Sequence, residues 1–226
     1  MRLGINFAMD EEREAFLALF DQKKASRDTL LDVYEITTDK NTIYAVKSGI
    51  GKVQAASIAT TFLTNYTVDY LLSSGIAGGY NTHIGALIIG TKYIQHDVDV
   101  RAFGYPLTQI PGLPAYFTPD KKLLSTLEKT LPKEGYQTGT IATGDQFITA
   151  IHHLDAVFKQ YPDIKAFEME TAALAQVAYI YKIPFLALRT ISDVVGSVDQ
   201  FEKYENTIKV TFDQNAQYLK TFCEAL

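Results

Sequence analysis

Short apolar runs alternate with segments of helical periodicity along most of the 226-residue chain, and this alternation is what most constrains the fold. Apolar runs bounded by turn residues are typical of buried strands. The predicted strands are Leu3–Phe7, Leu30–Thr37, Thr42–Lys47, Asp69–Ser73, Leu87–Ile94, Gly139–Thr143 and Pro184–Ile191. Because strands alternate with helices, the pattern favours an α/β fold in which helices pack against a parallel or mixed central sheet.

Four helices are predicted from their apolar spacing and their first residues. Acidic residues at 10–12 suit a helix start, and a glycine-punctuated turn at 48–52 precedes the second helix. The expected apolar faces are Phe16, Leu17, Leu19 and Phe20; Val53, Ala56, Ala59 and Leu63; Ala173, Val177 and Ala178 within Met169–Tyr181; and Tyr204, Ile208, Phe212, Ala216, Leu219 and Phe222 within Gln200–Leu226. Since no linker-like stretch divides the chain, we predict one domain, 1–226, built as a three-layer α/β/α sandwich with a central mixed sheet.

Composition and charge exclude several classes of protein. The chain is 47% hydrophobic with a net charge of −5, and its lysines and arginines are scattered, so we expect no nucleic-acid partner. No stretch approaches the ~20 apolar residues of a membrane span, and the first residues do not resemble a secretory leader. The one cysteine, Cys223, cannot form an internal disulfide. We therefore expect a cytoplasmic protein with no membrane partner.

Small and polar residues follow the predicted strands, at the positions where ligands bind in open α/β sheets. The segments are Ala8–Glu12, Ser74–Gly79, Gly144–Ile148 and Ser192–Asp193, with Phe167–Glu170 at the start of a helix. Three acids from separate segments, Glu12, Glu170 and Asp193, could therefore meet at one edge of the sheet. Each also has a purely structural interpretation, as a first-turn helix acid, a helix N-terminal acid and a capping residue in turn.

Other kinds of site find little support in the sequence. The four histidines are His83, His96, His152 and His153. They lack the paired spacing of zinc ligands, and we expect no metal at His96, Asp97 and Asp99. Cys223 lies near the end of the last predicted helix, which disfavours it as a nucleophile, and the turn at Gly49–Gly51 is too short for a Walker loop. We predict neither a metal nor a cofactor.

Several short motifs follow one another over nearly the whole chain. They are Gly4-Ile5 with Ala8–Glu12; Ser48–Val53; Gly75–Gly79; His96–Tyr105; Gln109–Gly112; Gly144-Asp145 with Phe147-Ile148; Glu168–Glu170 with Ala172-Ala173 and Ala175-Gln176; and Pro184-Phe185 with Arg189 and Ile191–Asp193. Any one motif is weakly specific, whereas the ordered set is strongly so. In this order they resemble the motifs of bacterial 5′-methylthioadenosine/S-adenosylhomocysteine nucleosidases, within the nucleoside phosphorylase superfamily. The resemblance implies a nucleoside phosphorylase-like fold.

The resemblance also implies a reaction. It is hydrolysis of the N-glycosidic bond of 5′-methylthioadenosine and S-adenosylhomocysteine, with 5′-deoxyadenosine as a further candidate, which releases adenine and the 5′-substituted ribose. Asp193 matches the family's general acid, which protonates purine N7. Glu12 matches the residue that activates the attacking water, as in inverting glycoside hydrolysis. Glu170 matches the carboxylate that binds the ribose hydroxyls, and Arg189 is expected to hold Glu12 or its water network.

Contacts to the substrate are implied as well. Phe147 matches the ring that stacks on adenine, and the main chain of Ile148 would read the purine edge. The further substrate-binding residues implied are Met9, Ile76, Ala77, Glu168, Met169 and Ser192. Ile50 and Phe201 would line the pocket for the 5′ substituent, with Tyr204 as the rival of Phe201. Val100 and Phe103 would come from the second subunit of a homodimer with a shared active site, so the irregular segment His96–Pro119 would cross the interface.

Three departures from the family's pattern leave the three acids in place but bear on substrate preference and rate. Ile76 stands where the family usually has a serine, Asn6-Phe7 replaces a small apolar pair, and the connection after Asp193 is slightly shorter.

Other functions remain as alternatives. One is a phosphate-dependent purine nucleoside or methylthioadenosine phosphorylase on the same fold. It would need arginine, hydroxyl and backbone donors around phosphate, and Glu12 would oppose it. The others are a non-catalytic nucleoside-binding protein and a hydrolase for a related 6-substituted purine nucleoside.

Overall fold

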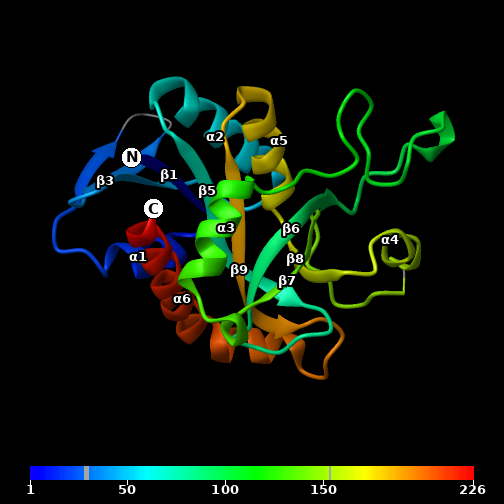
Figure 1. Cartoon of the computed structure of the whole chain (residues 1–226). Coiled ribbons are helices and arrows are strands. Elements are labelled where there is room, and N and C mark those ends of the chain that lie inside the picture. The colour runs from blue at the N-terminus through cyan, green and yellow to red at the C-terminus, as the bar shows by residue number, and fades with distance from the viewer. Residues whose placement is uncertain (28–30, 153) are drawn as a thin grey trace.

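The computed structural model describes residues 1–27, 31–152 and 154–226, and over these residues a nine-stranded sheet forms the centre of the molecule (Figure 1). The strands are β1 (Arg2–Phe7), β2 (Lys24–Arg27), β3 (Asp32–Thr37), β4 (Thr42–Lys47), β5 (Tyr70–Gly79), β6 (Leu87–Gln95), β7 (Gln137–Thr143), β8 (Ile164–Glu168) and β9 (Phe185–Val194). The α-helices are α1 (Asp10–Leu17), α2 (Lys52–Asn65), α3 (Lys121–Thr130), α4 (Asp155–Gln160), α5 (Thr171–Tyr181) and α6 (Gln200–Ala225), and the 3₁₀ turns are η1 (Arg101–Phe103) and η2 (Lys133–Gly135).

The sheet has the strand order β2-β3-β4-β1-β5-β8-β7-β6-β9 and contains both parallel and antiparallel pairs. Strand β1 runs parallel to β4 and β5, whereas β2, β3 and β4 pair in antiparallel fashion. Strand β9 pairs with β6 and also, in parallel, with β5. The strands β5, β8, β7, β6 and β9 therefore close into a ring, so this part of the sheet is barrel-like.

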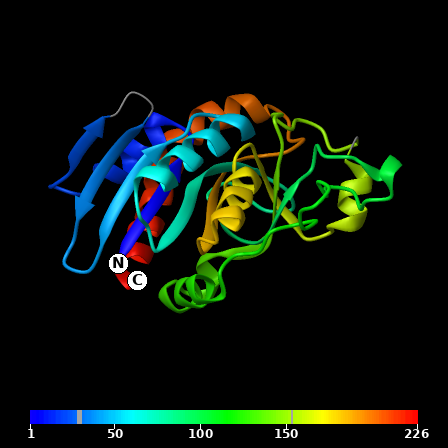
Figure 2. The ribbon, with the colours of Figure 1, turned by 90° about the horizontal axis from the view of Figure 1, so that it is seen from above.

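Helices cover both faces of the sheet, as the two views at right angles show (Figures 1 and 2). Helices α2 and α5 pack together on one face, and α1, α3 and α6 pack together on the other. Each face has its own apolar core, one containing Ala59 and Leu174 and the other containing Phe16, Leu127 and Leu219. The predicted three-layer sandwich with a central mixed sheet is confirmed, and the ring closure is an addition to it.

Some of the sequence-based expectations for these elements are wrong. Strand β5 continues through residues 74–79, which were expected to form a loop, because its backbone pairs with β9 along that length. Helix α2 buries Ala55, Ala59 and Phe62, whereas Val53, placed on the predicted apolar face, is 79% exposed. Apolar residues surround most of this helix, so periodicity alone gives no unique buried face. Leu30, the first residue of one predicted strand, lies outside the described residues.

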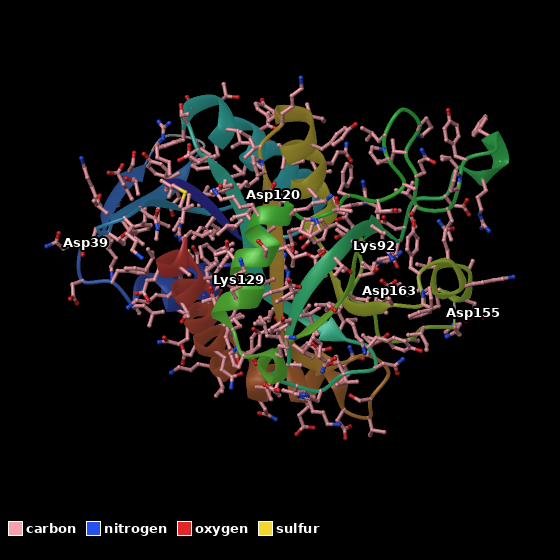
Figure 3. The ribbon with its side chains drawn as sticks, viewed as in Figure 1. Asp39, Lys92, Asp120, Lys129, Asp155 and Asp163 are labelled. Carbon is pink, nitrogen blue, oxygen red and sulfur yellow. The ribbon has the colours of Figure 1, made fainter. Side chains whose placement is uncertain are left out.

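Strand β8 and helix α3 are absent from the sequence-based prediction. Strand β8 is short and lies between β7 and β5, and Asp163 just before it pairs with Lys92 of β6 at 3.1 Å (Figure 3). Helix α3 starts after Asp120, whose side chain accepts hydrogen bonds from the backbone of Lys122 and Leu123, and carries Lys129 in its last turn (Figure 3). An aspartate cap followed by leucines is a helix signal that could have identified α3.

Helix α6 follows its predicted pattern closely. Phe212, Ala216, Leu219 and Phe222 are buried on the sheet side, while Tyr204 nearer the start is half-buried. Its other face is mostly polar, as in an amphipathic surface helix, although Phe201 and Val210 are exposed on it. No helix within the described part of the chain is long and apolar enough to cross a membrane.

Candidate active site

The C-terminal parts of β1, β5, β8 and β9 surround one cavity of about 120 Å³. Its lining residues are Ala8, Met9, Glu12, Ile50, Ile76, Ala77, Gly78, Phe147, Phe167, Glu168, Met169, Glu170, Ser192, Asp193 and Tyr204. Glu12, Glu170 and Asp193 all reach it and all are buried, so the convergence expected from the strand ends is present. Ligands of α/β proteins bind at this edge of a sheet.

Glu12 lies in the first turn of α1 and is held by backbone donors. Its Oε2 accepts hydrogen bonds from the N–H groups of Ala8 at 2.9 Å and Met9 at 3.1 Å, and its Oε1 accepts from Ile76 at 3.1 Å. A Cβ at Gly75 would overlap with the Glu12 carboxylate, so only glycine permits this approach. Burial raises the pKa of Glu12, while the nearby Arg189 charge opposes that shift. A carboxyl with a raised pKa is suited to accept a proton near neutral pH.

Asp193 lies near the end of β9 and is 1% exposed. Its Oδ1 accepts a hydrogen bond from the Ser192 hydroxyl at 2.7 Å, and its Oδ2 accepts one from the Gln200 amide at 2.7 Å. The lack of a side chain at Gly78 leaves room beside Oδ2, because a Cβ there would come within 3.3 Å of it. The carboxyl group is thus oriented from two sides while it faces the cavity.

Glu168 and Arg189 form a buried ion pair beside the cavity, at 2.9 Å. The Glu168 carboxylate also accepts from the backbone of Glu170 and Thr171 and from the Thr143 hydroxyl. Arg189 donates to Glu168, to the hydroxyls of Ser73 and Thr171, and to its neighbour's carbonyl. Arg189 therefore holds Glu168, whereas the resemblance implied that it would hold Glu12 or its water network. Buried charges need such partners. The Glu168 carboxylate is therefore engaged in hydrogen bonds within the protein.

Glu170 occupies the N-cap position of α5, and its Oε1 accepts a hydrogen bond from the backbone of Gly51 at 2.7 Å. Gly51 has a φ of 97°, which favours glycine and lets its N–H point at the carboxylate. Burial, with the Glu168 carboxylate nearby, raises the pKa of Glu170 to about 8. Glu170 is therefore a weakly acidic carboxyl, and ligand hydroxyls would be the natural partners of its second oxygen, Oε2.

This raised pKa predicts a pH-dependent stability difference for Glu170→Gln. Because the folded protein holds the Glu170 proton more tightly than the unfolded chain, stability from this group is fully present below about pH 4.5 and is lost as the pH rises to about 8. Glutamine removes that loss, so the variant should gain about 1–3 kcal/mol over the parent between pH 5 and 8. Urea unfolding at several pH values measures this, and parallel pH profiles for the two proteins would contradict it.

An aromatic wall borders the cavity. Phe147 lines it while remaining 51% exposed, and its ring meets Tyr204 edge-on with centroids 6.0 Å apart. Of the two candidates for the 5′ end, Tyr204 lines the cavity, whereas Phe201 is 63% exposed and stacks on the outer side of Tyr204. Burial raises the pKa of Tyr204, with smaller contributions from Glu12 and Asp193. The phenol therefore stays neutral beside the acids.

Three further predicted residues lie outside this cavity. Ile148 lines a smaller neighbouring cavity of about 40 Å³, together with Asp193 and Gln200. Val100 precedes the turn η1 and Phe103 lies within it, at 80% exposure, and neither borders the cavity of its own chain. This placement is compatible with their expected origin in a second subunit.

Chemistry, not volume, identifies this site. A larger cavity of about 560 Å³ lies between residues 114–121 and the end of α5, but its carboxylate, Asp120, is used as the cap of α3. Within the described residues no group of three or more His, Cys, Asp or Glu could hold a metal ion. Asp97 pairs instead with Lys52 at 2.7 Å, and Asp99 pairs with Arg101 at 2.6 Å. His153 lies outside the described residues.

Sequence reasoning missed the residues that support the acids. Thr143, Ser73 and Thr171 bind the Glu168–Arg189 pair, and Gln200 binds Asp193. These contacts join residues that are distant in the chain, and single polar residues carry no spacing signal. Of these residues, only Gln200 could have been predicted to lie near an acid, since it stands at the start of the last predicted helix, shortly after Asp193.

Comparison with known proteins agrees with this geometry. The family model of the phosphorylase superfamily matches residues 2–226. The 5′-methylthioadenosine/S-adenosylhomocysteine nucleosidase of Bacillus subtilis is 39% identical over 214 residues, which cover 89% of this chain and 91% of the relative. The chain belongs to this nucleosidase family. The resemblance inferred from the ordered motifs is thereby confirmed.

Solved structures of the nucleosidase family align over the whole chain. The Neisseria meningitidis nucleosidase in complex with methylthio-immucillin-A has a TM-score of 0.92 and 29% identity, covering 100% of this chain and 99% of that one. A Helicobacter pylori nucleosidase variant with 5′-methylthioadenosine in its active site has a TM-score of 0.91 and 26% identity, with coverage of 100% and 99%. The nucleoside phosphorylase-like fold is therefore confirmed.

Proposed function

We propose that the chain is an N-glycosyl hydrolase that cleaves 5′-methylthioadenosine and S-adenosylhomocysteine, with 5′-deoxyadenosine as a further candidate, to adenine and the 5′-substituted ribose. The observation that carries the proposal is the convergence of three buried carboxyl groups, Glu12, Glu170 and Asp193, on one cavity bordered by Phe147. Membership of the nucleosidase family supports the choice of substrate, as do the ligands of the two structural relatives.

Asp193 acts on the leaving group. When the C1′–N9 bond breaks, its electron pair passes to the purine, which leaves more easily if N7 is protonated. Asp193 donates that proton, and its carboxyl is held in place by Ser192 and Gln200. Phe147 stacks on the base, and the main chain of Ile148 reads the purine edge.

Glu12 and Glu170 act on the sugar. As C1′ becomes cationic, Glu12 takes a proton from a water molecule whose oxygen attacks C1′. Glu170 accepts hydrogen bonds from the ribose hydroxyls and, in its ionised form, places negative charge near the developing cation. Each turnover moves one proton onto Glu12 and one from Asp193, and exchange with water restores both groups.

The charges around the cavity favour water over phosphate as the nucleophile. Among the described residues that line it, no lysine or arginine occurs, whereas four carboxyl groups do. The adjacent cation, Arg189, is already paired with Glu168. A phosphate dianion needs positive or hydrogen-bonding partners and would here meet negative ones.

Adenine release tests the proposal directly. The purified chain is assayed for adenine release from 5′-methylthioadenosine, S-adenosylhomocysteine and 5′-deoxyadenosine, in buffer with and without phosphate. We expect release in phosphate-free buffer, with free 5-substituted ribose as the second product. Strict dependence on phosphate, with a sugar 1-phosphate as product, would establish the phosphorylase alternative. Binding without release would establish a non-catalytic binding protein.

A homodimer with a shared active site is part of this proposal. Ile50 and Val53 are exposed at the start of α2, Tyr179 and Ile180 are exposed at the end of α5, and these helices pack side by side. Where exposed apolar groups gather into one surface, they favour an interface. Pairing through this face would bring Val100 and Phe103 of the second copy over the 5′ end of the cavity, beside Ile50.

Phe103→Ala tests the shared site. Truncation of an aromatic side chain that anchors an interface costs more than about 1 kcal/mol, so we expect the KM for 5′-methylthioadenosine to rise about tenfold with kcat nearly unchanged. Val210→Ala, at an exposed apolar position of α6, is the control. Light scattering reports the oligomeric state of both variants. An unchanged KM in a Phe103→Ala protein that is still dimeric would rule out this contact.

A further inference from the structure

The side chain of Gln200 is built into the purine end of the site. Gln200 is the first residue of α6 and is 7% exposed. Its Nε2 donates to Asp193 Oδ2 at 2.7 Å and to the carbonyl oxygen of Ile148 at 3.0 Å, and its Oε1 accepts from the backbone of Gly196 at 3.0 Å. All three polar positions of the amide are therefore occupied.

The two acceptors that Gln200 binds are those that a 6-aminopurine would use. On the purine, N7 and the 6-amino group lie next to each other on one edge, as an acceptor beside a planar NH₂ donor. An acid that reaches N7 through one oxygen therefore has its other oxygen beside the amino group. The second amino hydrogen points toward the opposite edge, where the proposed reader is the Ile148 main chain.

A carboxamide NH₂ and an adenine NH₂ have the same donor geometry. Both are planar, carry two hydrogens and bind two acceptors at once. The nitrogen of Gln200 bridges Asp193 and Ile148 in this way without any ligand. An adenine amino group that bridges the same two oxygens from the same side would therefore take the place of the Gln200 amide.

We propose that Gln200 is a specificity-determining residue. Its amide occupies the position of the 6-amino group of the substrate base, and only a base with a hydrogen-bond donor at its 6-position displaces it. This inference rests on the proposed function, since it takes Asp193 and Ile148 as the groups that read the purine. A 6-oxopurine brings an acceptor to the same place, cannot replace the two hydrogen bonds and leaves Gln200 in its position. The discrimination between 6-amino and 6-oxo purines is thereby coupled to the movement of Gln200 out of the purine end of the cavity.

The size of the site supports a displacement. The catalytic cavity of about 120 Å³ is smaller than the roughly 300–1,000 Å³ that usually encloses a small ligand. The cavity of about 40 Å³ that Gln200 lines shares Phe147, Met169 and Asp193 with the catalytic one. Withdrawal of Gln200 would enlarge the space at the purine end.

Calorimetric titration with free bases tests the proposal without turnover. Adenine and hypoxanthine are titrated into the parent chain, Gln200→Ala and Gln200→Met. Methionine keeps most of the volume of glutamine but has no N–H donor. Because adenine no longer competes with two hydrogen bonds, its Kd should fall about tenfold in both variants. The Kd of hypoxanthine should change less than twofold, since its 6-oxygen cannot use the released acceptors.

Other outcomes would overturn the proposal in distinguishable ways. Weaker adenine binding in both variants would show that Gln200 positions Asp193 and the 194–199 connection for the ligand. Equal tightening of both bases, or tightening in Gln200→Ala alone, would show a purely steric effect, and unchanged values would show no role. Gln217→Ala, at an exposed position of the same helix, is the control. A parent chain that neither binds nor releases adenine would remove the proposed function itself.

Discussion

Asp193→Asn lowers kcat for adenine release by about 10²–10⁴-fold, the usual effect of removing a positioned general acid. The asparagine amide keeps nearly the same shape and can still accept one hydrogen bond from Ser192 or Gln200. It cannot transfer a proton to N7, so the purine must leave as an anion. Steady-state kinetics under saturating 5′-methylthioadenosine measure the loss.

The matched control is Asp199→Asn. Asp199 is exposed and has a φ of 59°, a left-handed conformation that asparagine adopts readily. We expect normal kcat for this variant and an unchanged unfolding midpoint for both. Near-normal turnover of Asp193→Asn would exclude Asp193 as the acid. An equal loss in the two variants would point instead to a disturbed β9–α6 connection.

Glu12→Gln should reduce kcat by a similar factor, about 10²–10⁴-fold, because the amide cannot take a proton from water. Glutamine would also set an NH₂ group against at least one of the backbone donors of Ala8, Met9 and Ile76. Adenine binding should survive, because the purine end of the site is formed by other residues. Calorimetry with adenine therefore distinguishes the loss of Glu12 as the general base from a loss of the folded structure.

Two companion variants sharpen this test. Glu12→Asp keeps the charge but shortens the side chain, so an intermediate loss is expected if the position of the carboxylate matters. Glu11→Gln alters the exposed neighbour in the same helix turn and should leave kcat unchanged. Full activity of Glu12→Gln would assign the activation of water to another group.

The structure also explains why the departure at Ile76 leaves the acids in place. Ile76 contributes its backbone N–H to Glu12 Oε1, and this donor does not depend on the side chain. The isoleucine side chain is 8% exposed and adds an apolar surface to the cavity. The substitution therefore changes what the substrate touches while keeping the support of the proposed base.

The order of motifs and the alternation of strands and helices determined the family, the layered architecture and the acids that meet in the cavity. Those properties are local or ordered along the chain: a strand end places Asp193, a helix start places Glu12, and each can be found in a few consecutive residues. Strand β8 was not predicted because it is only five residues long. Its strand structure depends on pairing with β7 and β5, which the local sequence does not indicate.

Only the tertiary structure decided how the acids are held and what shares their space. It assigned Arg189 to Glu168, placed Tyr204 in the cavity in preference to Phe201, and set the Gln200 amide between Asp193 and Ile148. The physical reason is that a hydrogen bond depends on distances of about 3 Å between atoms, and its partners here come from distant segments. Apolar periodicity indicates the buried face of elements such as α6, but it does not specify which polar group lies opposite.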